Sequence, residues 1–182
     1  SEVGQYLPSW RDKDYRKTVS AQKILGGGVL LELSHELDYL RWIFGDVEFV
    51  QAQLSKQSML NIDVEDNANI LITFKNNHKN TNLVASLSLD FIRHDRVRMC
   101  HVIGEKGSLR WNGLNGQVDL FEPNGAEWKN IHKGEANLDQ SYKDEWLHFI
   151  ECVNKKERPM ISFQDGVEVL NIIDSINDAS SS

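Results

Sequence analysis

The sequence contains only two cysteines, no surplus of positive charge and no long apolar run. Cys100 and Cys152 stand far apart without metal-ligand neighbours, which argues against a disulfide framework or a metal site and favours a cytoplasmic location. The net charge of -7 disfavours a nucleic-acid partner, because neutralising phosphates requires excess lysine and arginine. No apolar segment approaches the length of a membrane span, and no signal-peptide pattern opens the chain. We therefore expect a soluble globular protein with no nucleic-acid or membrane partner.

Two common nucleotide-binding signatures are absent as well. The triple glycine at 26–28 lacks the glycine that a G-x-G-x-x-G turn needs at position 31, where Leu31 stands. No P-loop sequence occurs anywhere in the chain. The glycines therefore have two interpretations. They let the chain bend into the following segment, or they let the backbone approach a ligand closely.

Helical periodicity begins directly after the glycines. Residues 1–25 before them are predicted to be irregular, because aromatic residues and arginines are mixed there with Pro8. Residues 29–44 are predicted to form one helix, which Gly45 ends. The apolar face of this helix consists of Leu30, Leu33, Leu37, Leu40 and Phe44.

From residue 47 to about residue 131 the apolar residues recur at every second position, which predicts β-strands. The clearest runs are 50–54, 68–74 and 83–91, and shorter ones are 97–103, 108–112 and 117–121. The polar stretch 75–82 is predicted to connect two strands of a hairpin. One-sided alternation over successive strands is typical of an antiparallel sheet with one buried face.

Two helices are predicted to close the chain. One has an apolar stripe formed by Tyr142, Trp146, Phe149 and Val153. The other has a stripe formed by Val169, Ile172, Ile173 and Ile176. Ser162 and Asp165 resemble a capping box at its start. The order helix, strands, helices predicts a single α+β domain over residues 1–182, with an open, mainly antiparallel sheet and helices on one face.

Three ionisable residues interrupt the apolar pattern of the first predicted helix. Glu32, His35 and Asp38 lie on neighbouring lines of a helix, because successive residues turn by about 100°. A histidine with a carboxylate one turn away has the composition of a general base and its orienting group. The alternative is a solvated or locally paired set of side chains. A zinc protease motif is excluded, because Tyr39 stands where the second histidine is required.

Several motifs together resemble a known family. "GQYLPSWR", "DYR", "GGGVLLELSHELDYLRWIFG", "GEKGSLRW" and "SFQDGVEVLNIIDSI" occur in this order along the chain. They resemble the C-terminal domain of the glucose-fructose oxidoreductase, inositol dehydrogenase and rhizopine catabolism family, called Gfo/Idh/MocA. The resemblance covers nearly the whole chain, and the glycine–carboxylate–histidine segment is its most specific part.

The resemblance implies an oxidoreductase with two domains. In this family an N-terminal Rossmann domain binds NAD or NADP and carries a Glu-Lys-Pro motif with a catalytic lysine. The C-terminal domain supplies the pocket for a sugar, sugar derivative or polyol, and hydride passes between a hydroxyl carbon and the nicotinamide. This sequence contains neither Glu-Lys-Pro nor a nucleotide-binding loop. We therefore expect this chain to be a substrate-binding and catalytic domain without its cofactor domain. We expect the chain on its own to be inactive.

The family's functional residues can be carried over to matching positions. His35 matches the histidine that exchanges a proton with the reacting hydroxyl, and Asp38 matches the acidic residue after it. Glu32 stands near the family's aspartate, although it is a glutamate placed three residues before the histidine rather than four. The residues similar to a loop bordering the substrate pocket are Tyr6, Trp10, Arg11, Tyr15 and Arg16.

The resemblance also leaves open questions of substrate and assembly. Arginines in the opening segment suit a carboxylate or phosphate on the substrate, whereas the alternative is surface pairing with Asp12 and Asp14. The competing function is a non-catalytic sugar-binding or oligomerisation module on the same fold. A homodimer or homotetramer is expected through the open sheet face. That face carries Asn67, Asn69, Thr73, Ser86 and Ser88.

Overall fold

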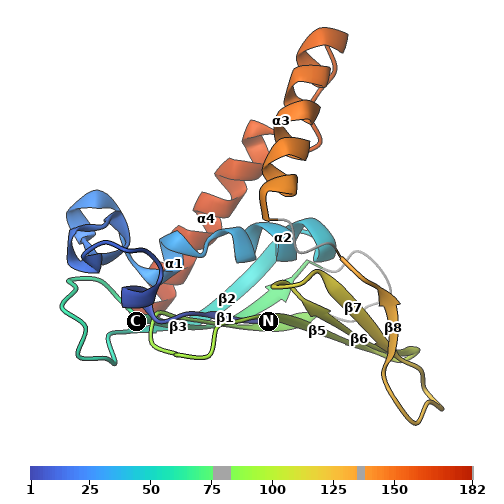
Figure 1. Cartoon of the computed structure of the whole chain (residues 1–182), viewed down its shortest axis with the longest axis horizontal. Coiled ribbons are helices and arrows are strands. Elements are labelled where there is room, and N and C mark those ends of the chain that lie inside the picture. The colour runs from blue at the N-terminus through green and yellow to red at the C-terminus, as the bar shows by residue number, and fades with distance from the viewer. Residues whose placement is uncertain (76–82, 135–137, 182) are drawn as a thin grey trace. The chain divides into compact units, whose positions relative to one another are not determined.

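The computed structural model describes residues 1–75, 83–134 and 138–181, which form an eight-stranded sheet and four α-helices (Figure 1). The strands are β1 (Glu2–Gly4), β2 (Val47–Ser55), β3 (Asn67–Phe74), β4 (Val84–Asp90), β5 (Val97–Gly104), β6 (Gly107–Asn112), β7 (Gln117–Phe121) and β8 (Lys129–His132). The α-helices are α1 (Val29–Glu32), α2 (His35–Phe44), α3 (Leu138–Lys155) and α4 (Phe163–Ser180). The opening segment adds four 3-10 turns, η1 (Leu7–Ser9), η2 (Tyr15–Lys17), η3 (Val19–Ala21) and η4 (Lys23–Leu25).

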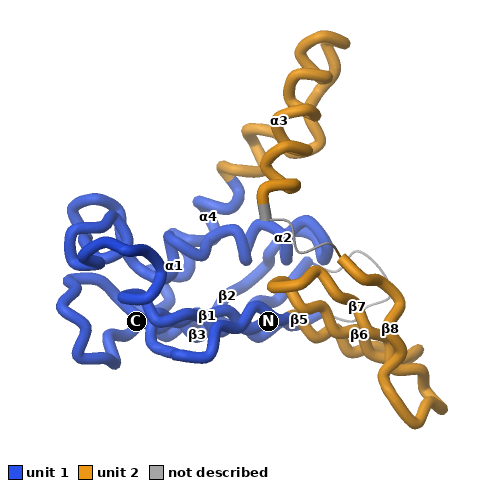
Figure 2. The backbone as a smooth tube through the Cα atoms, in the orientation of Figure 1, with its two compact units in different colours: residues 1–99, 168–182 blue, residues 100–167 orange. Residues whose placement is uncertain are grey.

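The sheet has the strand order β2-β3-β4-β1-β5-β6-β7-β8. Strand β1 runs parallel to β4 and antiparallel to β5, and the pairs β2–β3, β3–β4, β6–β7 and β7–β8 are antiparallel. This confirms the predicted open, mainly antiparallel sheet of an α+β fold. The chain divides into two compact units, residues 1–99 with 168–182 and residues 100–167 (Figure 2).

The core of the first unit follows the predicted alternation. On β3 the side chains of Ala68, Ile70, Ile72 and Phe74 are buried. Helices α1 and α2 and the C-terminal part of α4 lie on one side of the neighbouring strands (Figure 1). They contribute the buried side chains Leu30, Leu37, Leu40, Val169, Ile172, Ile173 and Ile176. Full burial of each aliphatic side chain contributes roughly 1.5–3 kcal/mol, so this layer of helix on sheet is the main stabilising feature of the unit.

Three local expectations need correction. The single helix predicted over residues 29–44 is broken, because Leu33 leaves helical torsion angles (φ -105°, ψ 21°) and α2 starts anew at His35. The opening segment is not wholly irregular, since it includes β1 and the 3-10 turns. Strand β8 was not among the predicted runs. The expected hairpin connection at 75–82 lies outside the described residues except for Lys75.

The triple glycine has a structural explanation. A Cβ atom on Gly27 would overlap backbone atoms of Val19 and Gln22, and one on Gly28 would overlap the carboxylate of Glu65. Gly28 also has a φ of +117°, which L-residues rarely adopt. Glycine is therefore required here for close packing of the chain against its own backbone and against Glu65.

Glu65 closes the N-terminus of α1 from the loop between β2 and β3. Its backbone carbonyl accepts a hydrogen bond from the Val29 amide (3.2 Å), and its Oε1 accepts one from the Leu30 amide (3.1 Å). Both amides belong to the first turn, where helical N–H groups have no partner within the helix. The next residue, the fully buried Asp66, accepts hydrogen bonds from the Gln57 and Ser58 amides and so fixes the loop itself.

The second unit contains the end of β5, strands β6–β8, helix α3 and the first turn of α4. Asp119 on β7 accepts hydrogen bonds from Gln117 (2.7 Å), Asn130 (3.0 Å) and Arg110 (2.9 Å). These three donors, in that order of effect, lower the pKa of Asp119 to about 2. The predicted capping box is confirmed, since Asp165 Oδ2 accepts from both the amide and the hydroxyl of Ser162 (2.7 Å each).

Replacing Gly28 with alanine is expected to destabilise the protein by about 1–3 kcal/mol, because alanine is strained at this φ and its methyl group displaces Glu65 from the helix N-terminus. The measurement is the free energy of unfolding in urea. Gly166→Ala is the matched control. Gly166 lies in α4 with open space around its Cβ position, so this change should stabilise the protein by up to about 1 kcal/mol. Equal stability of both variants would contradict the assignment.

The stability of the protein is expected to fall between about pH 4 and pH 2 as Asp119 takes up a proton. The folded-state pKa of Asp119 lies below its ordinary value, so its contribution is present above pH 4 and is lost as the pH falls through about 2. Thermal unfolding followed by circular dichroism at stepped pH values measures this. Asp119→Asn should be less stable than wild type at neutral pH, and the difference should vanish near pH 2. The exposed change Glu105→Gln should follow the wild-type curve; an undiminished Asp119→Asn difference at pH 2 would refute the role of this carboxylate.

Candidate functional site

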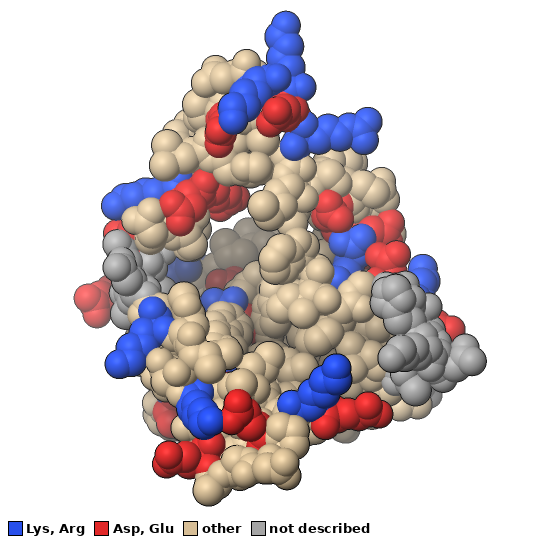
Figure 3. Space-filling view, turned by 90° about the vertical axis from the view of Figure 1, so that its right-hand side faces the viewer, with Lys and Arg blue, Asp and Glu red and all other residues tan. Residues whose placement is uncertain are grey.

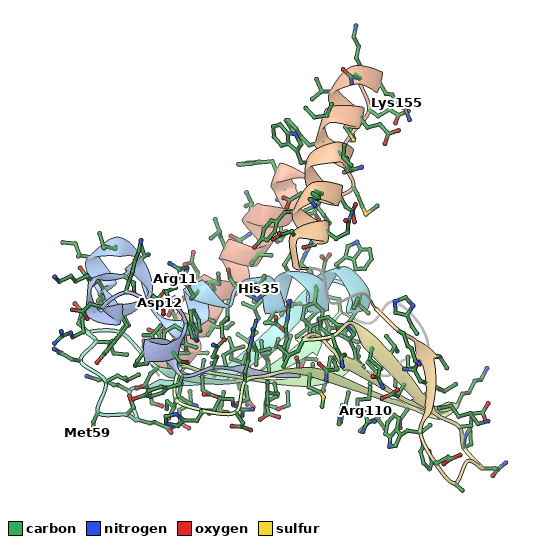
Figure 4. All side chains as sticks on the ribbon, viewed as in Figure 1. Arg11, Asp12, His35, Met59, Arg110 and Lys155 are labelled. Carbon is green, nitrogen blue, oxygen red and sulfur yellow. The ribbon has the colours of Figure 1, made fainter. Side chains whose placement is uncertain are left out.

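His35 is the first residue of α2 and stands directly after the break that separates α2 from α1. Its side chain is 52% exposed, and Figure 4 shows it at the junction of the two helices. The start of α1 is fixed by the glycines together with the distant Glu65, and Leu33 leaves helical geometry four residues later. The arrangement leaves an imidazole accessible to a small molecule at a helix start.

One buried carboxylate connects His35 to the sheet. His35 Nε2 lies 3.2 Å from Oε1 of Glu36, and the Glu36 side chain is 0% exposed. The same Oε1 accepts a hydrogen bond of 2.8 Å from Nε of Arg98 on β5. The other oxygen of Glu36, Oε2, is buried and has no hydrogen-bond partner among the described residues. A carboxylate out of water needs a nearby positive charge, and the Arg98 guanidinium supplies it.

Sequence reasoning missed both partners of this contact. Adjacent residues on a helix point about 100° apart and are not expected to meet, so helical periodicity does not predict a contact between His35 and Glu36. One signal was present: Glu36 lies between Leu33 and Leu40 on the apolar face, where a charged residue is rarely buried without a partner. Arg98 comes from a strand 62 residues away and carries no such signal.

The two carboxylates that the sequence predicted as helpers of His35, Glu32 and Asp38, are not the one that lies against its ring. Glu32 ends α1 and Asp38 lies in the first turn of α2, and both side chains are half-buried. Within the described ranges neither makes an ion pair or hydrogen bond with His35. Their catalytic assignment therefore stays a prediction, and the geometry offers Glu36 as a third carboxylate for the same role.

The predicted pocket-lining aromatic residues pack against their own unit. Tyr6 stacks on His94 with ring centroids 4.1 Å apart, and Trp10 meets the edge of Phe91 at 5.2 Å. Trp10 Nε1 also donates to the Gln5 carbonyl (3.0 Å). These contacts hold the opening segment against the end of β4, so each ring has a packing function whether or not it meets a ligand.

The other predicted substrate-binding residues of this segment differ in the hydrogen bonds and ion pairs that they form. Arg16 forms a two-point ion pair with Asp14, with both distances 2.8 Å. The pair raises the pKa of Arg16 and lowers the pKa of Asp14. The Tyr15 hydroxyl accepts from the Asn61 amide (3.2 Å), while Arg11 is exposed. The surface-pairing alternative thus describes Arg16, whereas no ion pair of Arg11, another exposed residue of this segment, is found among the described residues.

The hollows of the first unit are not centred on His35. The one beside Trp10, Arg11 and Tyr15 measures about 10 Å³, which holds no more than one water. A larger groove of about 760 Å³ runs between η4, α1 and the loop before β3, and one of about 380 Å³ runs between α2, β2 and α4. His35 lines none of these three. A sugar-sized site at His35 therefore requires lining residues other than those of these three hollows.

The charged side chains of the surface do not form a patch of one sign on the face drawn in Figure 3. Lysines and arginines are interspersed with acidic residues over the face drawn in Figure 3. Among the residues that the structure describes, no group of three or more His, Cys, Asp and Glu side chains could hold a metal ion. None of the helices in the described part of the chain is long and apolar enough to cross a membrane.

The fold is that of the C-terminal alpha/beta domain of an oxidoreductase family. Residues 2–182 match the family described as the oxidoreductase family, C-terminal alpha/beta domain, of Gfo/Idh/MocA. The chain belongs to this family. No curated protein sequence matches it.

Solved structures share the fold at low sequence identity. An aldose-aldose oxidoreductase from Caulobacter crescentus complexed with glycerol is 20% identical, with a TM-score of 0.78 over 99% of this chain and 52% of that one. A levoglucosan dehydrogenase in complex with NADH and levoglucosan is 20% identical, with a TM-score of 0.82 over 99% and 55%. The WlbA dehydrogenase from Bordetella pertussis, in complex with NADH and UDP-GlcNAcA, is 18% identical, with a TM-score of 0.70 over 99% and 50%. This chain spans about half the length of these proteins.

Proposed function

We propose that this chain is the substrate-binding and proton-transferring domain of an NAD(P)-dependent oxidoreductase that acts on a hydroxyl carbon of a sugar, sugar derivative or polyol. The observation that carries the proposal is a half-exposed histidine held by a buried carboxylate at a helix start. Family membership and the levoglucosan and UDP-GlcNAcA bound in two structures of similar fold support the substrate class. Both cysteines are free and buried, which fits the cytoplasmic location that we infer.

The cofactor is assigned to a separate part of the polypeptide. The described residues do not fit a dinucleotide: the glycines at 26–28 follow a 3-10 turn rather than a strand, and α1 is a single turn. The cradle of strand, glycine turn and long helix that binds a pyrophosphate is thus missing from this part of the chain. We infer that an N-terminal Rossmann domain, outside residues 1–182, binds NAD or NADP.

His35 then carries the proton chemistry of the reaction. Oxidation of a secondary alcohol removes a hydride from carbon and a proton from oxygen, and a general base beside the hydroxyl accepts the proton. A neutral imidazole is suited to this near neutral pH. The buried carboxylate of Glu36, 3.2 Å away, stabilises the imidazolium that results. Glu32 at the end of α1 and Asp38 in the first turn of α2 remain candidate helpers.

Arg11 is the residue that we assign to an acidic substituent of the substrate. It is exposed, whereas Arg16 is paired with Asp14. Guanidinium groups bind carboxylates and phosphates at two points, which suits a uronic acid or a nucleotide-linked sugar. The same opening segment contains Tyr6, Trp10 and Tyr15, whose packing contacts and hydrogen bonds hold its backbone in place.

In the full-length polypeptide that contains this chain, His35→Asn is expected to lower kcat about 10²- to 10⁴-fold with little change in KM, because a general base acts in the transition state. The measurement is reduced nicotinamide formed from a panel of neutral sugars, acidic sugars, polyols and nucleotide sugars. His132→Asn, the same change at an exposed histidine of β8, is the matched control. Turnover by His35→Asn at the wild-type rate would refute the proposal.

A second candidate function, self-association through the open sheet face, has an observation of its own. Two neighbouring rows of outward residues across β2, β3 and β4 are uncharged although 26% of the chain is charged. In register these rows are Gln51–Leu71–Ser86 and Gln53–Asn69–Ser88, and the next row ends at Asp90, which is paired with Arg93. A patch without unpaired charge costs little to desolvate against a second copy, so we propose a homodimer or homotetramer formed here.

Placing a charge on this face is expected to dissociate the oligomer. Leu71→Arg puts an unpaired guanidinium among uncharged neighbours, whose burial in an interface is costly. Sedimentation equilibrium of wild type and variant measures the change. Leu170→Arg, at an exposed leucine of α4, is the control that should keep the wild-type state. A monomeric wild type, or an unchanged oligomer in Leu71→Arg, would rule out this face as the interface.

A further inference from the structure

The two nitrogens of His35 have different surroundings. Nε2 faces Oε1 of Glu36 at 3.2 Å. An unprotonated Nε2 would turn its lone pair toward the negative carboxylate, which repels it, whereas an N–H is attracted; we therefore place the hydrogen of the neutral ring on Nε2. In the neutral ring Nδ1 then holds the lone pair, and only a nitrogen with a lone pair can accept a proton.

Glu36 is held in place by contacts beyond its own helix. Its side chain is fully buried, and Arg98 Nε donates to the same Oε1 at 2.8 Å. Arg98 belongs to β5 and lies opposite Val3 of β1, inside the sheet. The carboxylate is thus fixed by the sheet while the imidazole is half-exposed, so the exposed ring takes its orientation from the buried group.

The break between α1 and α2 makes this contact possible. Consecutive residues within a helix diverge by about 100° and do not face each other. His35 is the first residue of α2, and no helical turn of α2 precedes it. Its ring is therefore free to fold back over the side chain of the next residue.

We propose that Glu36, backed by Arg98, is a positioning residue that holds His35 in its Nε2–H tautomer, so that Nδ1 is the atom that takes the substrate proton. This inference rests on the proposed function. In the step, the O–H bond of the substrate hydroxyl breaks as the Nδ1–H bond forms, and the carbon that bears this oxygen becomes a carbonyl carbon as it loses its hydride, which a nicotinamide bound by the full-length protein would accept. The resulting imidazolium lies next to the Glu36 carboxylate, an arrangement in which the carboxylate fixes the tautomer and stabilises the charge.

Nuclear magnetic resonance of the ¹⁵N-labelled chain tests the tautomer without any turnover. In ring ¹H–¹⁵N correlation spectra of the neutral imidazole, His35, assigned by its loss in His35→Asn, should carry its hydrogen on Nε2. Glu36→Gln should raise the Nδ1–H population several-fold, because an amide N–H can donate to Nε2. Glu48→Gln, at an exposed glutamate of β2, should leave the spectrum unchanged. A wild-type ring protonated on Nδ1, or the same tautomer ratio in Glu36→Gln, would overturn the proposal.

A second variant covers the case in which Glu36→Gln does not fold. Glu36 and Arg98 are a largely buried pair, and removing one charge leaves the other without its partner. The double variant Glu36→Gln/Arg98→Gln has two neutral side chains of similar length at the same place. Circular dichroism establishes its folding, and its His35 spectrum is then expected to show the same gain in the Nδ1–H form.

Kinetics of the full-length polypeptide separate this inference from the proposed function. Glu36→Gln is expected to lower kcat about 100-fold with little change in KM. Loss of activity in His35→Asn together with wild-type kcat and tautomer in Glu36→Gln would refute the positioning residue alone. Wild-type activity in His35→Asn would refute the proposed function itself. A larger loss in Glu32→Gln or Asp38→Asn than in Glu36→Gln would transfer the role to that carboxylate.

Discussion

The contact of Glu36 with Arg98 and His35 links the parts of the first unit that matter for function. It ties the start of α2 to β5 across 62 positions of sequence, and it does so with a carboxylate that is completely out of water. Such a group is costly to bury, so its presence in an otherwise aliphatic layer requires the guanidinium beside it. Because Arg98 holds the Glu36 carboxylate in place, the His35 ring lies against a fixed negative group. An apolar side chain could fill the space of Glu36, but only a carboxylate there can interact with both Arg98 and His35.

The position of this contact depends in turn on how α1 begins. Gly27 and Gly28 let the chain pass close to the turns before them and to Glu65, and Glu65 satisfies the first amides of α1. Because α1 is only one turn long, its start also sets its end and the start of α2. The glycines therefore act on the site through geometry. Their close approach is to Glu65 and to neighbouring backbone, so the flexibility that suggested ligand binding is used to place a helix.

Membership of the oxidoreductase family and the shared fold define the context of the site. At 20% identity or less the similar structures establish the arrangement of strands and helices, and the chemistry rests on what His35 and its neighbours show. In the first unit the helices, with His35 at the start of α2, lie on one side of the sheet, and the uncharged rows of β2–β4 face the other side. The proposed proton transfer and the proposed self-association would therefore use opposite sides of one sheet.

The sequence by itself determined the class of fold and most of its helices and strands. Periodicity of two over β2–β4 and helical stripes in α2 and α4 were legible, because burial on one face repeats along the chain. The capping box before α4 was legible because its partners lie three residues apart. Only the tertiary structure decided which carboxylate lies against His35. Glu36 is adjacent in sequence, but ideal helix geometry does not bring neighbouring side chains together, and Arg98 reaches Glu36 from a distant strand. The break at Leu33 and the short strand β1 also depended on long-range hydrogen bonds, which a local pattern does not contain.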